Sequence, residues 1–391
     1  MATHFNPRRV LRQVSNQLLR EFFTRRDQLD HIPWPYLPET YIRPIFAAWQ
    51  RMPEAQRKEI QVVLQNIHAL ADQRGVRVLA EEIQQRCPEQ ADEFTTCRGR
   101  YDKAMWAYLT VPEVFAEAAL FARADALSTG RYWVTHNSLP REPLAVSGEA
   151  QEAFRQALSD FYWRRQLRGS CVVVEHYRRC DGDDYFFVYL DDYPDSRLVF
   201  NDAGQMEKRT DRCAFDNVFV FSPEEGALSL YAKGGKQVHI PLHQAFCETL
   251  LGMAVEPCEL LKPAFQLDHL IDPSFPLTTD PADQVAEARI LALGLEVRDR
   301  PRRRITLEAD PGGPSDDIHQ MLDRYLSLSP ARLRVKSARF RLMFLNGGKD
   351  GPRTLTFRVS CPRYCNLKSK PDEMQSIGQR CLKLWGIVVD E

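Results

Sequence analysis

The sequence lacks the short motifs that identify many nucleotide-dependent and hydrolytic enzymes. Neither GxxxxGK[ST] nor GxGxxG occurs, which excludes the common phosphate-binding loops. There is no GxSxG nucleophile motif, and the nine histidines are dispersed along the chain. We therefore expect no cofactor and no metal, and we favour a non-enzymatic protein over an enzyme.

Paired cysteines and long apolar runs are also missing. The ten cysteines include no CxxC pair, which argues against a zinc ribbon or a redox motif. The first residues, 1–6, are polar and no apolar stretch follows them, so we expect no secretory signal peptide. No run approaches the roughly 18 apolar residues that a membrane-spanning helix needs. We expect a cytoplasmic protein with reduced cysteines and no membrane contact.

The charge balance is nearly neutral. The 391 residues carry a formal net charge of −1, which argues against nucleic-acid binding along the whole length but allows a local basic patch. The 52 basic residues comprise 41 Arg and 11 Lys, and Arg is the residue that makes bidentate contacts with phosphate and carboxylate. A hydrophobic content of 44% is ample for packed cores, and the length predicts two or three domains.

Residues 1–168 carry the apolar spacing of helices, and we predict a helical domain there. Asn6 is a good helix cap because Pro7 follows it, and proline is favoured at the first helical position. A helix that starts after Pro53 is predicted to end at Gly75. Thr110 and Glu113 have the spacing of a capping box for the next apolar run.

The pattern changes to short runs of β-branched and aromatic residues in 169–255. The segments CVVVEHYRR, DYFFVYL, RLVF, NVFVF and ALSLYA are separated by turn-forming residues, which predicts an antiparallel β-meander of about five strands. Pro241 is expected to start a helix that covers one face of this sheet. Residues 256–284 carry five prolines and are predicted to be a linker or a packed loop.

Residues 285–391 form the clearest unit. The expected order is β-α-β-β-α, with one further strand or helix in the segment ARILALGLEVR. We therefore predict a small C-terminal α/β sandwich, which makes the whole chain an α+β protein.

A basic patch lies in this C-terminal unit. Between Arg298 and Arg341 we count eleven basic residues against six acidic ones. In the segment ARLRVKSARFRLMFL the apolar residues change parity near Ser337, and a β-bulge there would keep one basic and one apolar face. We predict an arginine-rich sheet that contacts nucleic acid or an acidic partner through Arg302, Arg303, Arg304, Arg332, Arg334, Lys336, Arg339, Arg341, Arg353 and Arg358.

An aspartate cluster gives the alternative hypothesis, a divalent-metal nuclease or phosphodiesterase. Asp183, Asp184, Asp191 and Asp192 bound a predicted strand, and grouped carboxylates can hold Mg²⁺. No acid-x-Lys pair accompanies them, and aspartate is also a common turn residue. His239, His243 and Cys247 have helical spacing, but Pro241 is expected to exclude His239 from the helix, so no zinc site is predicted.

These observations favour a binding or adaptor protein. The helical region would contact partner proteins, and the C-terminal sheet would contact DNA, RNA or an acidic partner. We expect a component of a prokaryotic multi-protein system, such as an anti-phage defence system. A small-ligand sensor built on the middle sheet is a weaker third hypothesis.

Overall fold

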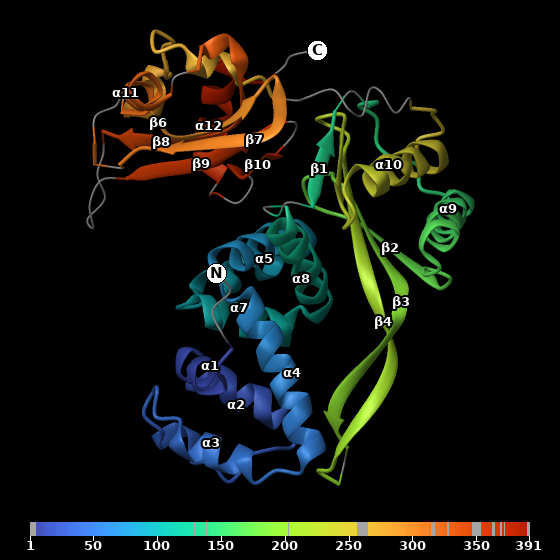
Figure 1. The fold of residues 1–391 in the computed structure, drawn as a ribbon. Coiled ribbons are helices and arrows are strands. Elements are labelled where there is room, and N and C mark those ends of the chain that lie inside the picture. The colour runs from blue at the N-terminus through green and yellow to red at the C-terminus, as the bar shows by residue number, and fades with distance from the viewer. Residues whose placement is uncertain are drawn as a thin grey trace. The chain divides into compact units, whose positions relative to one another are not determined.

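The computed structural model describes residues 5–128, 130, 132–137, 139–201, 203–255, 265–310, 312–313, 317–326, 328–345, 353–361, 364–367, 370 and 372–388. These residues form twelve α-helices and two five-stranded antiparallel sheets, which confirms the predicted α+β class (Figure 1). Contacts divide the chain into a helical unit, Met1–Ala124 with Tyr177–Asp183, and a second unit, Asp125–His176 with Asp184–Glu391.

The helical unit is built from short helices around an apolar core. They are α1 (Pro7–Gln13), α2 (Asn16–Thr24), α3 (Arg43–Gln50), α4 (Glu54–Leu70), α5 (Gln73–Arg86), α6 (Ala91–Thr96), α7 (Arg100–Thr110) and α8 (Pro112–Leu127). Asn6 caps α1 as predicted, because its Oδ1 accepts hydrogen bonds from the backbone N–H groups of Arg8 and Arg9.

Two predicted helix boundaries in this region are wrong. Gly75 does not end a helix: α4 already ends at Leu70, and Gly75 lies in the first turn of α5, where its N–H donates to Asp72 Oδ1 (2.7 Å). A Cβ atom at Gly75 would lie 2.4 Å from Leu70 O, so the glycine permits a close approach of two backbones. Thr110 is the last residue of α7 and does not cap α8.

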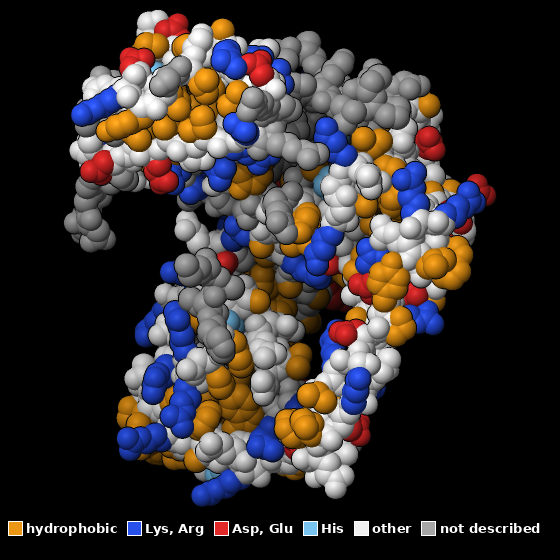
Figure 2. Space-filling view, in the orientation of Figure 1, with side chains coloured by type: hydrophobic (Ala, Val, Ile, Leu, Met, Phe, Trp, Pro, Cys, Tyr) orange, Lys and Arg blue, Asp and Glu red, His pale blue; other side chains and the backbone are white. Residues whose placement is uncertain are grey.

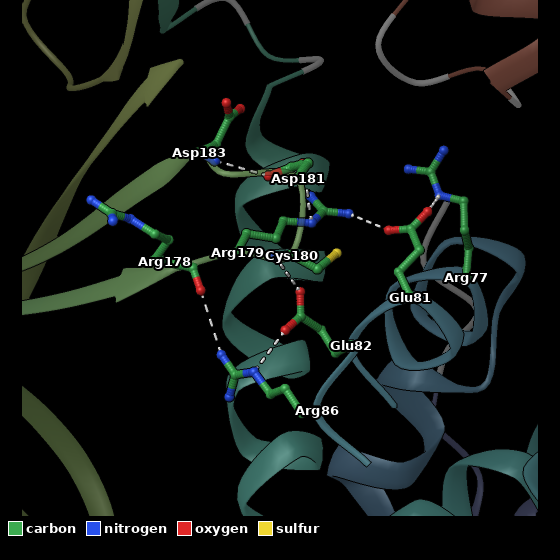
Figure 3. Close-up of polar contacts among 9 residues, drawn as sticks. All are labelled: Arg77, Glu81, Glu82, Arg86, Arg178, Arg179, Cys180, Asp181 and Asp183. Carbon is green, nitrogen blue, oxygen red and sulfur yellow. Dashed lines mark hydrogen bonds and ion pairs between the residues drawn. The ribbon is translucent and has the colours of Figure 1, made fainter. Parts of the chain in front are cut away.

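The tip of the hairpin between β2 and β3, residues 177–183, belongs to the helical unit. Figure 3 shows it held by hydrogen bonds and ion pairs to side chains of α5. The Glu82 side chain is fully buried, accepts a hydrogen bond from Cys180 N–H (3.1 Å) and forms an ion pair with Arg86 (3.1 Å). The buried Arg179 donates to Glu81 Oε2 (2.9 Å). We call these contacts the hairpin clasp.

The middle sheet comprises β1 (Trp133–His136), β2 (Val172–Arg178), β3 (Asp184–Phe200), β4 (Met206–Ser222) and β5 (Ala227–Tyr231), in the order β1-β5-β4-β3-β2. Helices α9 (Gly148–Gln166) and α10 (Lys236–Leu250) lie on one face (Figure 1). Phe154 of α9 and Phe246 of α10 pack edge to face, and both contact Phe186 and Phe219 of the sheet.

This sheet differs from the prediction in three details. The segments DYFFVYL and RLVF are two halves of one long strand, β3. Strand β1 comes from the part of the chain that was predicted to be helical. Helix α10 begins at Lys236 and contains Pro241, which therefore does not start it.

The C-terminal sheet comprises β6 (Val285–Val297), β7 (Arg300–Glu308), β8 (Leu333–Phe344), β9 (Thr354–Ser360) and β10 (Tyr364–Cys365), in the order β10-β9-β8-β6-β7. Helices α11 (Asp317–Tyr325) and α12 (Asp372–Leu384) share one apolar core with its buried face. Two strands therefore precede α11, and the ambiguous segment ARILALGLEVR is a strand. Across the described residues, no helix has the length and apolarity needed to cross a membrane.

We predict that Glu82→Ala lowers the free energy of unfolding by about 2 kcal/mol, because it leaves the Cys180 N–H without its acceptor, while Arg86 keeps its ion pair with Glu117. Glu82→Gln, which keeps the shape of the side chain, should lower the free energy of unfolding by less. Denaturant titration followed by circular dichroism measures both.

The matched control is Glu54→Ala, which removes an exposed carboxylate from the Lys58 ion pair on α4. That change should have no measurable effect on stability. A Glu82→Ala protein as stable as the control would contradict the structural role of the clasp.

Candidate nucleic-acid interface

The position of one residue in β8 decides which side chains of this strand face outward. Opposite β6, Gly294 pairs with Ser337 and Leu295 pairs with Val335, so Lys336 has no partner of its own and forms a bulge. Buried residues therefore change from odd numbers, such as Val335, to even numbers, such as Ala338. The bulge predicted near Ser337 is confirmed.

We call the side of the C-terminal sheet opposite α11 and α12 the outer face. Arg339 lies directly opposite Arg358 of β9, and Arg341 lies directly opposite Arg289 of β6. At the other end of the face, Glu296 of β6 lies between Arg334 of β8 and Arg304 of β7. The basic residues that the register places on this face are Arg289, Arg304, Arg334, Arg339, Arg341 and Arg358, and the bulge residue Lys336 joins them through its contact with Glu296.

Acidic residues compensate only part of this charge. The register adds three acids to the outer face, namely Glu287, Glu296 and Glu308, so the described residues of the face carry a formal charge of +4. Lys336 Nζ lies 3.5 Å from Glu296, and Arg339 pairs with Glu308. Figure 2 shows Lys and Arg side chains gathered along the part of the C-terminal unit where β8 and β9 lie.

Three other predicted residues lie away from the outer face. Arg303 shares the alternation of the inward-facing Ile305 and is exposed at the sheet edge. Arg332 lies before β8 and pairs with Asp299 (2.6 Å). Arg353 pairs with Glu373 of α12, on the helix side of the sheet. Arg302 is part of β7, but its side chain lies outside the described residues.

Sequence reasoning missed Arg289. This residue is only 7% exposed, and its Nη1 donates to the backbone oxygen of Gly313 (2.7 Å). The signal was present in the alternation of ARILALGLEVR, but that segment was compatible with either a helix or a strand, and only the strand places Arg289 beside Arg341.

The four aspartates of the alternative hypothesis make separate local contacts. Asp184 is fully buried and lies 2.8 Å from His176 Nε2. Asp192 accepts a hydrogen bond from Arg168 (2.8 Å). Asp183 is in the hairpin tip, where its backbone oxygen accepts from the N–H of Arg179.

Asp191 accepts hydrogen bonds from Cys171 N–H (2.7 Å), Ser170 Oγ (3.0 Å) and Arg212 Nη1 (2.8 Å). Burial alone would raise the pKa of its carboxyl group, but these hydrogen bonds and the Arg212 charge outweigh burial and lower that pKa. The described part of the chain contains no group of three His, Cys, Asp or Glu side chains that could hold a metal ion. The geometry thus offers no specific support for the nuclease hypothesis.

The three residues considered for zinc do lie on one helix, contrary to expectation, because α10 extends past Pro241 in both directions. His239 Nε2 lies 2.6 Å from the backbone oxygen of Ala232, and His243 Nδ1 lies 3.5 Å from Cys247 Sγ. Burial raises the pKa of Cys247 to about 12 and lowers the pKa of His239. A thiol in this state is a poor nucleophile and a poor metal ligand at neutral pH.

Comparison of this chain with protein-family models, curated proteins and solved structures finds no match.

We predict that Asp191→Asn destabilises the protein at pH 7 and that the difference from the unmodified protein shrinks as the pH falls. Because folding lowers the pKa of this carboxyl group, its stabilising contribution is present above the ordinary aspartate pKa and is lost as pH falls through the folded-state value. Thermal unfolding measured from pH 7 to pH 3 tests the sign. A difference that stays constant or grows toward low pH would contradict the assignment.

Proposed function

We propose that this protein is a non-enzymatic binding or adaptor protein that contacts a polyanion, in the first place nucleic acid, through the outer face of its C-terminal sheet. One observation carries the proposal: seven basic residues, all but Arg289 at least partly exposed, share with three acidic residues a sheet face that α11 and α12 leave open. A local charge of this kind in a chain with a net charge of −1 is compatible with one restricted binding surface.

The chemistry of the face suits phosphate groups. Guanidinium groups make bidentate contacts with phosphate oxygens, and the neighbouring outward hydroxyl groups of Ser337, Thr356 and Thr306 can donate further hydrogen bonds. One of these hydroxyl groups already accepts a hydrogen bond from an arginine of the face, since Arg358 Nη2 lies 3.3 Å from Ser337 Oγ.

The exposed ion pair between Arg339 and Glu308 leaves its cation available. In the pair with Glu308, the Arg339 side chain is 34% exposed and the carboxylate 62% exposed, and ion pairs at such exposed positions contribute little to stability. A phosphate can therefore compete with the carboxylate for the guanidinium group. Arg334 and Arg304 have no ion-pair partner among the residues that the structure describes, and both are exposed.

The adaptor part of the proposal rests on the helical unit, which would contact partner proteins. Burial, followed by the hydrogen bond and charge of Glu82, raises the pKa of Cys180 to about 12, so this thiol is a poor nucleophile at neutral pH. Membership of a prokaryotic multi-protein system, including a defence system, stays a proposal that no particular residue of the chain supports.

We predict that the triple variant Arg334→Glu, Arg339→Glu and Arg358→Glu binds a 30-base-pair DNA duplex at least about tenfold more weakly than the unmodified protein. The slope of log affinity against log salt should fall by about three, since each lost phosphate contact removes about one. Electrophoretic mobility shift at several salt concentrations measures both quantities. Single-stranded RNA and polyglutamate, used as parallel probes, distinguish nucleic acid from an acidic protein partner.

The matched control reverses three exposed arginines elsewhere, Arg57→Glu, Arg164→Glu and Arg165→Glu, and so changes the net charge equally. It should bind with a nearly unchanged salt slope. Equal losses in both triple variants, or no binding of any polyanion at low salt, would refute the proposed function.

A further inference from the structure

Strands β3 and β4 continue beyond the middle sheet as a two-stranded arm, residues 192–200 and 206–215. The neighbouring strand β5 pairs with β4 only from Val218 to Ser222. On the other edge of the ribbon, Asp191 N–H of β3 donates to Cys171 O. Beyond that hydrogen bond, no described strand other than β4 pairs with β3. Within the described residues the arm therefore pairs only with itself, and both of its strands have an open edge.

The two faces of the arm differ in chemistry. One face carries Leu198, Phe200 and Met206, which are 70%, 75% and 64% exposed. The other face carries charged residues from both strands. A two-stranded ribbon of this kind is only marginally stable in water by itself, so its open edges and exposed apolar residues point to a binding partner.

The charged face is poorly matched across its own two strands. Asp195 lies directly opposite Asp211, and Arg197 lies directly opposite Arg209, so like charges face each other twice. Such pairs destabilise a β-ribbon. The compensating contacts run along each strand, from Arg197 to Asp195 (3.3 Å) and from Arg209 to Asp211 (3.0 Å), and Arg197 also donates to Cys213 Sγ. These exposed contacts contribute little.

We infer that the partner is a second copy of this chain, paired antiparallel along the open edge of β3. A two-fold axis through Ser196 places Asp195 of each copy directly opposite Arg197 of the other, so the segment Asp195-Ser196-Arg197 is complementary to itself. The pairing gives Asp195 and Arg197 each a cross-strand partner of opposite sign, which the hairpin alone does not provide.

Antiparallel pairing of two copies about a two-fold axis is less favourable along the open edge of β4. An axis through Thr210 would place Arg209 opposite Asp211, but it would also place Lys208 opposite Arg212 of the second copy. On the β3 edge no like charges meet. The two-fold axis places a Pro194, which has no N–H group, near each end of the pairing, so the hydrogen-bonded ladder is short and the contact is reversible.

Sedimentation equilibrium of the full chain, without any polyanion, tests this inference through a charge swap. The unmodified protein should show a concentration-dependent monomer–dimer equilibrium. Asp195→Arg alone and Arg197→Asp alone should each weaken the dimer at least about tenfold, because like charges then meet across the axis. The double variant Asp195→Arg, Arg197→Asp restores complementarity and should return the dimer constant to within about threefold of the original.

The control Lys208→Asp makes the same change in charge on the other strand, opposite the uncharged Leu198, and should leave the dimer intact. A protein that is monomeric at all concentrations up to about 1 mM would overturn the inference, because even weak specific pairing is populated there. It would also be overturned by a double variant that stays as weak as the single ones, or by a control that weakens the dimer as much as Arg197→Asp does.

Discussion

The functional account depends on one packing constraint in β8: apolar side chains from both halves of this strand must reach the same core. Val335 and Phe340 are both buried there although one is odd-numbered and the other even-numbered. Strict alternation would send half of them to solvent. The bulge at Lys336 resolves this conflict, and it also brings Arg334 and Arg339 to one side of the sheet.

The molecule uses ionised groups in two different ways. In the hairpin clasp, Glu82 and Arg179 are buried and each has close partners of opposite charge or a backbone donor, so these groups maintain structure. Along the arm, and for all the described cations of the outer face except Arg289, the charges are at least partly exposed, and ion pairs such as Arg339–Glu308 contribute little. Exposed charges of the second kind are the ones that an external ligand can recruit.

Local sequence patterns predicted the elements of the C-terminal unit well, because apolar alternation in 333–344 and the helical spacing of 372–384 are strong signals. These patterns failed where contacts between residues far apart in the sequence determine the local structure. Gly75 resembles a helix stop, yet its lack of a side chain serves the approach to Leu70. Arg332 and Arg353 look equivalent to Arg358 in sequence, but only the strand register and the acids on neighbouring elements separate them.

The most direct test of the account is the reactivity of individual arginines toward phenylglyoxal, followed by mass spectrometry with and without bound DNA. A guanidinium group that contacts phosphate is shielded from the reagent. The account predicts protection of Arg334, Arg339, Arg341 and Arg358 together, with Arg57 and Arg164 unchanged. Equal modification of the outer-face arginines in free and bound protein, or protection confined to other arginines, would contradict it.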